Sequence, residues 1–346
     1  MPDRPRLTPA VADVRRAVRE ALGDPPGQAL ADGLVLVALS GGPDSLALAA
    51  ATAFEAPRAG LRAGAVVVDH GLQDASAGVA ERAAGQARAL GLDPVRVVRV
   101  EVVASGEGVE AAARAARYAA LDAAAAELGA HAILLGHTLD DQAETVLLGL
   151  ARGSGAASLQ GMAPRTGAYR RPLLGIRRAT TVQACADAGL EPWDDPHNAD
   201  PAYARVRVRR EVLPVLEAEL GPGVAEALAR TAEQLREDAE ALDAFADEVA
   251  EDIVELEEAG VSLSVSALAA NPAALRQRLI RLVAGSEFHV SLSRAQTLAI
   301  ARLVTDWHGQ AALDLPGFTA ARRGNRIHLV STEAGELTGR KPPHDH

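Results

Sequence analysis

Cysteine and lysine are almost missing from this sequence of 346 residues, which contains only Cys185 and Lys341 of these two types. A single cysteine excludes an internal disulfide and a zinc site built on cysteines. The single lysine stands near the C-terminus, so the phosphate loop of pattern G-x-x-x-x-G-K-[ST] is absent, and a buried Schiff-base lysine is excluded as well. Any phosphate loop in this chain must therefore work without lysine.

Long apolar runs are also absent. The wholly apolar runs are short, such as LVLVAL at 34–39, whereas a membrane-spanning helix needs about 18 residues. The N-terminal MPDRPRLTPA has no apolar stretch after its charges, so it is not a signal peptide. We therefore expect no membrane association and a cytoplasmic location, and the length predicts about two domains.

The net charge of −11 disfavours nucleic-acid binding by the whole surface. The span 152–210 has the opposite sign, because it holds ten arginines and five acidic residues and is therefore locally +5. Such a span is either a solvated charged surface or a footprint for a phosphate backbone within an acidic protein. The sequence alone leaves both interpretations open.

Strand-like runs alternate with helical patterns in the first half of the chain. Strands are expected at 34–39, 63–69, 95–103 and 131–136, and helices at about 44–55, 75–90, 107–128 and 139–151. Buried Val- and Leu-rich strands that alternate with helices predict an α/β fold with a doubly wound, Rossmann-type parallel sheet. Such sheets bind ligands beyond the carboxyl ends of their strands. The turns after residues 39, 69 and 136 are therefore the expected places for a site.

The second half has a different character. An irregular region rich in proline and arginine is followed, after LGPG at 220–223, by apolar residues at helical spacing up to Leu256. Further helix is expected at 272–308, and short strands with a Pro-Gly turn at 311–330. We therefore predict a first domain at 1–215, a smaller, mainly helical second domain at 216–335 and a disordered tail at 336–346.

The sequence SGGPDS at 40–45 joins the first predicted strand to the first predicted helix. Gly41 and Gly42 permit a close approach of the backbone to a ligand, Pro43 suits the first turn of a helix, and the serines and free amides can bind an anion. A carboxylate beside a phosphate is repulsive unless a cation joins them, so Asp44 suggests a magnesium-bound pyrophosphate. The alternative is an N-capped helix after a tight turn, where Asp and Ser are common.

Charged residues also gather on a predicted helix at 107–121. Glu110, Arg114, Arg117 and Tyr118 stand there at spacings of three and four residues, which allows one shared face. The alternative for the two arginines is ordinary ion pairing at the surface.

Acidic residues follow the second and fourth predicted strands. The second strand ends in Asp69 and His70, and GHTLDDQAET begins the next helix after the fourth strand. In that helix Asp140 and Glu144 are four apart and are expected to project together, with Asp141 beside them. The alternative for these acids is stabilisation of the helix dipole in the first turn.

Taken in order, these segments resemble those of the tRNA(Ile)-lysidine synthetases. The unit of strand, SGGPDS and helix is shared by the wider ATP pyrophosphatase group, which cleaves ATP between its α and β phosphates. GHTLDDQAET, RPLL at 171–174 and WDDPHN at 193–198 are specific to this family in combination. LRQRLIRL at 275–282 and LPGF at 315–318 extend the resemblance to the second domain.

The resemblance implies a defined reaction. Such an enzyme binds the isoleucine tRNA with a CAU anticodon, adenylates O2 of its wobble cytidine with ATP and Mg²⁺, and lets free L-lysine displace AMP. The first domain is then the ATP-binding catalytic domain, and the second binds tRNA. A homodimer is compatible with this assignment.

The resemblance also implies site residues. The expected catalytic residues are Asp44, Arg117, Asp140, Asp141 and Glu144. The expected nucleotide-binding residues are Ser40, Gly41, Gly42, Pro43, Asp44, Ser45, Asp69, His70 and Gly136, with Mg²⁺ on Asp44. The expected substrate-binding residues are Glu110, Arg114, Arg117, Arg152, Arg205 and Arg209.

The chain departs from the family pattern at three positions. Thr138 stands where a second histidine is usual, and His197 and Val206 stand where Ser and Asn are usual. A tRNA thiolation enzyme of the same fold is disfavoured, because it needs several cysteines to carry sulfur or an iron–sulfur cluster. An amidating synthetase is disfavoured by the lack of a glutaminase or oligomerisation segment. A non-catalytic ATP-binding module has no reason to place Asp44 and the later acids near a polyphosphate.

Overall fold

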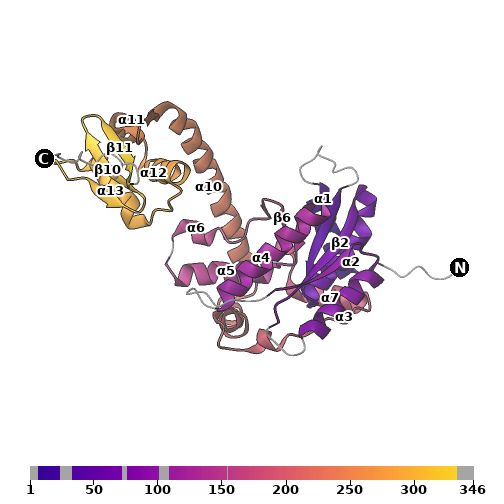
Figure 1. Cartoon of the computed structure of the whole chain (residues 1–346). Coiled ribbons are helices and arrows are strands. Elements are labelled where there is room, and N and C mark those ends of the chain that lie inside the picture. The colour runs from indigo at the N-terminus through magenta and orange to yellow at the C-terminus, as the bar shows by residue number, and fades with distance from the viewer. Residues whose placement is uncertain (1–6, 24–32, 72–75, 101–108, 154, 333–346) are drawn as a thin grey trace. The chain divides into compact units, whose positions relative to one another are not determined.

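The computed structural model describes residues 7–23, 33–71, 76–100, 109–153 and 155–332. The chain forms two compact units, residues 1–236 and 237–346, and their boundary falls inside helix α10 (Val224–Ile253). Figure 1 shows the elements of each unit. The domain limits expected from the sequence stay predictions, and the tail expected at 336–346 lies outside the described residues.

The first unit is built on a six-stranded sheet in the order β3-β2-β1-β4-β6-β5. Strands β1 to β4 and β6 run parallel, and β5 pairs with β6 in the antiparallel sense. In the register, Val37 lies opposite Ala65 on β2 and Leu134 on β4. The strands are β1 (Leu34–Leu39), β2 (Arg62–Asp69), β3 (Val95–Arg99), β4 (Ala130–Leu135), β5 (Arg165–Thr166) and β6 (Tyr169–Arg170).

Helices cover both faces of this sheet, because alternate residues of its buried strands point to opposite sides. On one face, Val35 and Val37 pack in a core with α1, α2, α3 and α7. On the other face, Leu34 and Leu36 pack against Leu121 and other residues of α4. The helices are α1 (Pro9–Gly23), α2 (Pro43–Glu55), η1 (Pro57–Ala59), α3 (Ser76–Ala89), α4 (Val109–Leu128), α5 (Leu139–Ala151), α6 (Ala156–Leu159), η2 (Pro172–Gly175), α7 (Arg178–Asp187), η3 (Pro196–Ala199), α8 (Ala204–Arg207), η4 (Val208–Val212) and α9 (Leu213–Leu220).

The predicted doubly wound α/β fold is therefore confirmed. Two details differ from expectation. Helix α1 was not predicted, although its buried Val14 and Val18 are spaced by four as in an amphipathic helix. Strand β3 ends at Arg99 in the described part, and residues 101–103 of the predicted strand lie outside it.

Strand β1 lies between β2 and β4, so the chain reverses its direction of winding at β1. A parallel sheet binds ligands beyond the carboxyl ends of its strands at such a reversal. The loop at 40–42 follows β1, and the segment 136–138 follows β4, so both lie at this edge. The fold thus brings the two segments together by topology.

The segment 204–220 is one helical run in three parts. Residues Val208–Val212 form a π-helical turn between α8 and α9. Insertions of this kind occur often at functional sites. Here the turn carries Arg209, which contacts helix α5.

The second unit contains a five-stranded antiparallel sheet in the order β7-β8-β11-β10-β9. Its core joins sheet residues such as Leu263, Phe318 and Leu329 to Leu279 and Ile300 of the helices. The elements are β7 (Val254–Glu257), β8 (Gly260–Ser264), α11 (Val265–Ala270), α12 (Ala273–Phe288), α13 (Arg294–Thr305), β9 (Leu313–Leu315), β10 (Phe318–Arg323) and β11 (Arg326–Ser331). The sheet is more extensive than the mainly helical composition expected from the sequence.

Helix α10 buries a narrower set of residues than its apolar pattern suggests. Its buried positions recur every seven residues and are mostly alanine: Ala225, Ala232, Ala239, Ala246 and Ile253. Phe245 and Leu256, which fit the helical spacing of the apolar residues, are exposed, and Leu256 lies on β7. In the described part of the chain, no helix is both long and apolar enough to span a bilayer.

Candidate functional site

Glycine and serine residues fix the conformation of the loop at 40–42, which joins β1 to α2. Gly41 has a φ of +85°, and a Cβ there would come within 3.3 Å of the Cβ of Ala83, so this position requires glycine. The Ser45 hydroxyl donates to the Gly42 carbonyl at 3.0 Å and accepts from the Ser40 amide at 3.2 Å. Gly136 lies directly against α2, because its Cβ would be 3.1 Å from the Ser45 nitrogen.

Capping does not explain the polar residues of this loop. Gly42 is the N-cap of α2, and no side chain of the described residues caps this helix end, so its first amides remain available to an anion. Asp44 points away from its own helix and accepts hydrogen bonds from Thr181 and from Arg178 Nε, the latter at 3.1 Å. The alternative in which Asp44 and the serines cap α2 is therefore wrong.

The acids of α5 have different partners. Asp141 Oδ2 accepts from the Thr138 amide at 2.8 Å and from its hydroxyl at 2.9 Å, which completes a capping box at the start of α5. Thr138, where the family usually has histidine, is thus the N-cap of this helix. The helix-terminus interpretation is correct for one oxygen of Asp141, while Oδ1 faces arginines.

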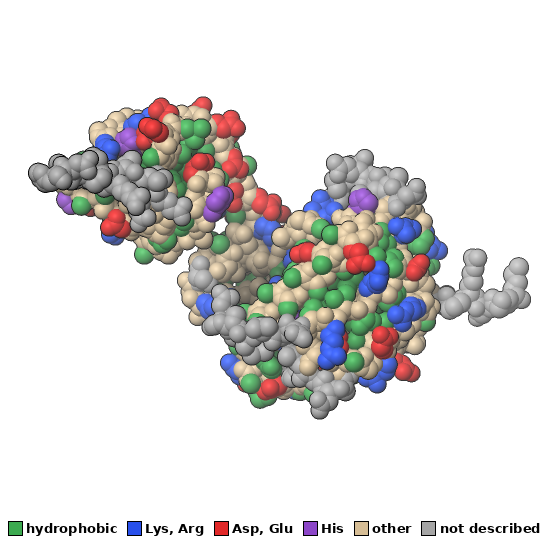
Figure 2. Space-filling view, in the orientation of Figure 1, with side chains coloured by type: hydrophobic (Ala, Val, Ile, Leu, Met, Phe, Trp, Pro, Cys, Tyr) green, Lys and Arg blue, Asp and Glu red, His purple; other side chains and the backbone are tan. Residues whose placement is uncertain are grey.

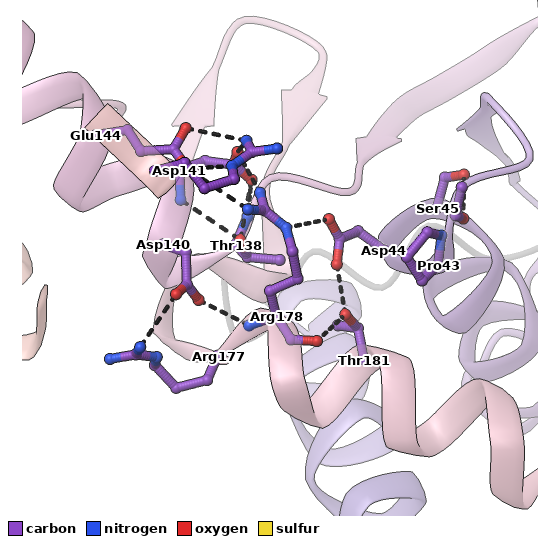
Figure 3. A network of polar contacts seen from close by, with 12 residues as sticks. Pro43, Asp44, Ser45, Thr138, Asp140, Asp141, Glu144, Arg177, Arg178 and Thr181 are labelled. Carbon is purple, nitrogen blue, oxygen red and sulfur yellow. Dashed lines mark hydrogen bonds and ion pairs between the residues drawn. The ribbon is translucent and has the colours of Figure 1, made fainter. Parts of the chain in front are cut away.

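Asp44, Asp141 and Glu144, here called the acid cluster, converge on Arg178 (Figure 3). The guanidinium of Arg178 lies 3.1 Å from Asp44, 2.6 Å from Asp141 and 3.4 Å from Glu144. Burial lowers the pKa of Arg178, but the three carboxylates outweigh burial and hold its pKa above the usual value. For Asp44 the balance is reversed, since burial raises its pKa more than Arg178 and Thr181 lower it.

A second arginine supports the same cluster from the π-helical turn. Arg209 contacts Glu144 at 2.6 and 3.0 Å and Asp141 at 3.3 Å. The Glu144 side chain is fully buried, so this two-bond pair compensates a carboxylate that has no access to water. Arg205 approaches Glu144 at 3.8 Å and donates to the Thr145 hydroxyl.

Asp140 does not project with Glu144, contrary to the expectation from their spacing. Its Oδ2 accepts from the backbone amide of Arg178 at 2.7 Å, and its Oδ1 lies 3.1 Å from Arg177 (Figure 3). Asp140 thus supplies a carboxylate to the N-terminus of α7, which favours negative charge. Asp141 and Glu144, three residues apart, share the other side of α5.

A cavity of about 230 Å³ opens at the ends of β1 and β2. The Asp69 carboxylate accepts from the Gly71 amide at 3.0 Å; burial raises the pKa of Asp69, but this bond and one from Ser76 lower it overall. Burial and the nearby Arg117 lower the pKa of His70. The polar and aromatic residues around the cavity include Ser40, Asp69, His70, Arg117, Trp193 and Asp195.

The charged residues of α4 divide between this cavity and the surface. Arg117 lines the cavity, and burial lowers its pKa. Arg114 is exposed and donates to the Tyr118 hydroxyl at 3.3 Å. Glu110 is the second residue of α4, and its side chain lies outside the described part.

The basic span 152–210 is not a uniform solvated surface. Arg177, Arg178, Arg205 and Arg209 are paired with carboxylates, whereas Arg152 is exposed. Figure 2 shows that basic and acidic side chains are interspersed over the visible face of the first unit, with hydrophobic side chains between them. These four of the ten arginines therefore balance the acids of α5 and Asp44.

Sequence reasoning missed Arg178, Thr181 and Trp193. One signal for Arg178 was present: two arginines stand at the start of a helix, where the dipole disfavours cations unless carboxylates lie opposite. His137 was also missed. Burial lowers its pKa to about 4, and its Nδ1 is buried with no hydrogen-bond partner among the described residues.

Comparison with known proteins finds family models for both parts of the chain and relatives along most of its length. Residues 12–216 match the PP-loop domain family, and residues 263–328 match the TilS substrate binding domain. The tRNA(Ile)-lysidine synthase of Leifsonia xyli subsp. xyli is 68% identical over 295 residues, which cover 85% of this chain and 89% of the relative. The tRNA(Ile)-lysidine synthase of Thermobifida fusca is 57% identical over 328 residues, 94% of this chain and 98% of the relative.

A solved structure shares the fold of a large part of the chain. The U34-tRNA thiolase NcsA from Methanococcus maripaludis, with its [4Fe-4S] cluster, aligns with a TM-score of 0.53 and 20% identity, covering 66% of this chain and 80% of that one. At this identity the likeness shows the fold alone. The PP-loop match implies use of ATP. With both domain models matched and relatives of high identity along most of its length, this chain belongs to the tRNA(Ile)-lysidine synthase family.

Proposed function

We propose that this chain ligates free L-lysine to carbon 2 of the wobble cytidine of CAU-anticodon tRNA(Ile), with cleavage of ATP to AMP and pyrophosphate. The observation that carries the proposal is the placement of the acid cluster beside the uncapped start of α2. One edge of the sheet thereby combines an anion site with carboxylates suited to a cationic substrate.

In the first step, the cytosine O2 attacks the α-phosphate of ATP, and the bond from that phosphorus to the bridging oxygen breaks, so that pyrophosphate leaves. The amides of Gly41, Gly42, Asp44 and Ser45 and the Ser40 and Ser45 hydroxyls hold the departing pyrophosphate and stabilise its developing charge. The cavity at β1 and β2 accepts the adenosine, with Asp69 and His70 at its wall. Arg117, in the same cavity, is placed to neutralise the adenylate phosphate.

In the second step, the ε-amine of lysine attacks carbon 2 of the adenylated base, and AMP leaves with the former O2. The amine must lose protons during this step, and a carboxylate of α5 can accept one. The acid cluster also gives the lysine ammonium groups a partner. Asp140 acts indirectly. It accepts a hydrogen bond from the backbone amide of Arg178 at the start of α7 and so positions Arg178.

Magnesium fits this site only together with the nucleotide. Among the described residues, no three His, Cys, Asp or Glu side chains are grouped to hold a metal ion. Asp44 is a single carboxylate beside the phosphate loop, and Mg²⁺ is commonly bound by one or two carboxylates together with substrate phosphates. Asp44 would hold the ion there, and a bound Mg²⁺ would supply positive charge for the pyrophosphate.

Exposed cations supply contacts to the RNA backbone. Arg152 and Arg114 are exposed, so these side chains are available to phosphates. Arg205 is 40% exposed and lies 3.8 Å from Glu144, so it would contact a phosphate from the edge of the acid cluster. Arg209 is occupied by Glu144 and acts on the cluster instead. Glu110 is retained as a substrate-binding residue, and the cytoplasmic location and a homodimer stay predictions.

The thiolase likeness does not extend to sulfur chemistry in this chain. Cys185 is the sole cysteine, it is buried, and its thiol donates to the Pro43 carbonyl. Burial raises the pKa of this thiol to about 11, which disfavours the reactive thiolate. One such cysteine can neither ligate a [4Fe-4S] cluster nor provide a carrier pair.

The test is a reconstituted reaction. The protein is incubated with ATP, Mg²⁺, L-lysine and CAU-anticodon tRNA(Ile), and the digested nucleosides are analysed by mass spectrometry. The expected product is a cytidine that has gained lysine and lost water, formed one for one with AMP. The proposal fails if AMP forms without tRNA while the wobble cytidine stays unmodified. Asp44→Asn is expected to abolish pyrophosphate release while the circular dichroism spectrum is unchanged.

A further inference from the structure

The acid cluster of the first unit is already occupied by a cation from the protein itself. Arg178 Nε lies 3.1 Å from Asp44, and its Nη2 lies 2.6 Å from Asp141. Arg178 therefore joins Asp44, in the segment 40–45 that we call the phosphate loop, to Asp141 of helix α5 (Figure 3). This is the position that the proposed function assigns to Mg²⁺ and to the lysine ammonium.

Among the described residues, the charges at this position balance without any ligand. The acid cluster contributes three carboxylates, and the guanidinium groups that the described residues place within 4 Å of it belong to Arg178, Arg209 and Arg205. An additional cation would leave an excess of positive charge in a largely buried site, which is costly at low dielectric. A substrate cation can therefore enter only if a guanidinium leaves or if new negative charge arrives.

ATP brings such negative charge to the adjacent amides of α2. Arg178 is the guanidinium among these that reaches Asp44, so it is the one nearest to an incoming polyphosphate. Guanidinium groups bind phosphate and carboxylate with similar geometry, which makes an exchange of partners possible. The backbone of Arg178 stays fixed during such an exchange, because its amide is held by Asp140.

Arg209 is not suited to the same exchange. It makes two bonds to Glu144, whose side chain has no exposure, so its departure would leave a buried charge unpaired. Arg178 contacts Glu144 only at 3.4 Å, and its closer contacts are with Asp44 and Asp141, whose side chains are 19% and 10% exposed. Release of Arg178 would therefore leave less fully buried charge unpaired than release of Arg209.

We infer that Arg178 is a positioning residue that makes binding of lysine and of the divalent cation conditional on ATP. Without nucleotide, Arg178 occupies the acid cluster and excludes the cationic substrate. With nucleotide, Arg178 turns to the phosphates and releases the carboxylates. The inference rests on the proposed function for the identity of the cationic substrate, and it predicts ordered binding with ATP before lysine.

The experiment measures lysine binding to the full chain by isothermal titration calorimetry, with and without Mg²⁺ and α,β-methylene-ATP, which cannot be cleaved at the reacting bond. In the unsubstituted protein, the nucleotide is expected to tighten lysine binding by about 5- to 150-fold, the usual range of coupling between sites. In Arg178→Gln, lysine is expected to bind without nucleotide, and the effect of nucleotide falls to less than about threefold. Arg178→Lys keeps the positive charge but lacks the paired N–H donors of a guanidinium. In this variant, the effect of nucleotide on lysine affinity should therefore be intermediate.

The control is Arg16→Gln, which removes the same charge from an exposed pair with Asp13 on α1 and should retain the full dependence on nucleotide. A second readout is Mn²⁺ binding without nucleotide, followed by electron paramagnetic resonance. Arg178→Gln, or Arg178→Lys if the glutamine variant does not fold, should bind Mn²⁺ more tightly than the unsubstituted protein.

The outcomes separate the two hypotheses. The inference is overturned if lysine binds equally with and without nucleotide, or if both Arg178 variants keep the original dependence; the proposed function survives either result. A third result is that neither the unsubstituted protein nor its variants bind lysine, while the Arg178 variants gain Mn²⁺ affinity. In that case lysine is not the substrate of the acid cluster, and the role of Arg178 as an internal counter-ion stands.

Discussion

The backbone amide of Trp193 donates a hydrogen bond to the carbonyl oxygen of Gly41 at 2.9 Å. This bond attaches the segment after α7 to the phosphate loop, so the indole becomes part of the wall of the cavity at β1 and β2. Glu191, two residues earlier, exchanges two hydrogen bonds with the Gln86 side chain of α3. The segment that carries Trp193 is therefore fixed both to Gly41 and to helix α3.

We predict that Trp193 reports on nucleotide binding and contributes to it. The chain has two tryptophans, so Trp307→Phe leaves Trp193 as the only indole. In that background, Mg-ATP should change the tryptophan fluorescence. Trp193→Ala should weaken ATP binding by roughly 5- to 150-fold, because stacking on a base contributes about 1–3 kcal/mol. Trp193→Phe should retain most of the affinity, and fluorescence that ignores saturating Mg-ATP would contradict the prediction.

Gly136→Ala is predicted to impair ATP use more than it impairs folding. The added Cβ would meet the backbone of Asp44 and Ser45 at 3.1 Å, so the start of α2 must shift by a few tenths of an ångström. A shift of that size misplaces the amides that hold the phosphates, and kcat/KM for ATP should fall by about 10- to 100-fold. The measurement is pyrophosphate release beside a thermal melt.

Gly85→Ala is the matched control for this substitution. Gly85 lies within α3, and apart from its neighbours in this helix no described atom lies within 4 Å of the Cβ that alanine would add. Alanine should therefore stabilise the helix by about 0.5–1 kcal/mol and leave ATP use unchanged. Equal loss of activity in both variants would show that the close contact at Gly136 is not the cause.

The free energy of unfolding is predicted to fall as the pH drops from 6.5 to 4. Burial lowers the pKa of His137 from 6.5 to about 4, so in this window the unfolded chain binds a proton that the folded chain does not. The stability from this group is complete above pH 6.5 and is lost toward pH 4, with a slope of at most about 1.4 kcal/mol per pH unit. His70, whose pKa is also lowered, acts in the same sense, whereas Asp44, whose pKa burial raises, acts in the opposite sense.

Urea denaturation at several pH values measures this slope. His137→Gln removes the titrating group, so its stability should depend less on pH between 6.5 and 4 than that of the unsubstituted protein. A parallel pH dependence in the two proteins would exclude His137 as a source of the effect.

The sequence allowed prediction of the elements whose signal is local. The buried runs at 34–39 and 131–136 and the glycines of SGGPDS identify strands and a turn, because burial and backbone freedom belong to the residues themselves. The end of helix α10 was not predicted, since Leu256 fits the helical spacing but lies on a strand and is 80% exposed. Periodicity cannot show where a helix gives way to a strand of similar composition.

The candidate site could be predicted only in part for a related reason. The segments around Asp44 and Glu144 follow strands, so topology alone places them at one edge of the sheet. The partner of Asp44 is Arg178, which stands 134 residues later in the chain, and no local pattern encodes that pairing. The direction of Asp140 was wrong because its partner, the amide of Arg178, comes from another helix.

Replacement of Cys185 is predicted to leave the ligation intact, which separates this chain from sulfur-transferring enzymes of the same fold. The thiol lies behind the phosphate loop with its Sγ 3.2 Å from the Pro43 carbonyl, and burial raises its pKa to about 11. Cys185→Ser keeps the donor and should keep kcat within about threefold, since a neutral hydroxyl can make the same bond. At pH 8 the native thiol should react slowly with iodoacetamide, because little thiolate is present. Loss of all tRNA modification in Cys185→Ser, with ATP binding and thermal stability unchanged, would instead assign a chemical role to this sulfur and contradict the ligase mechanism.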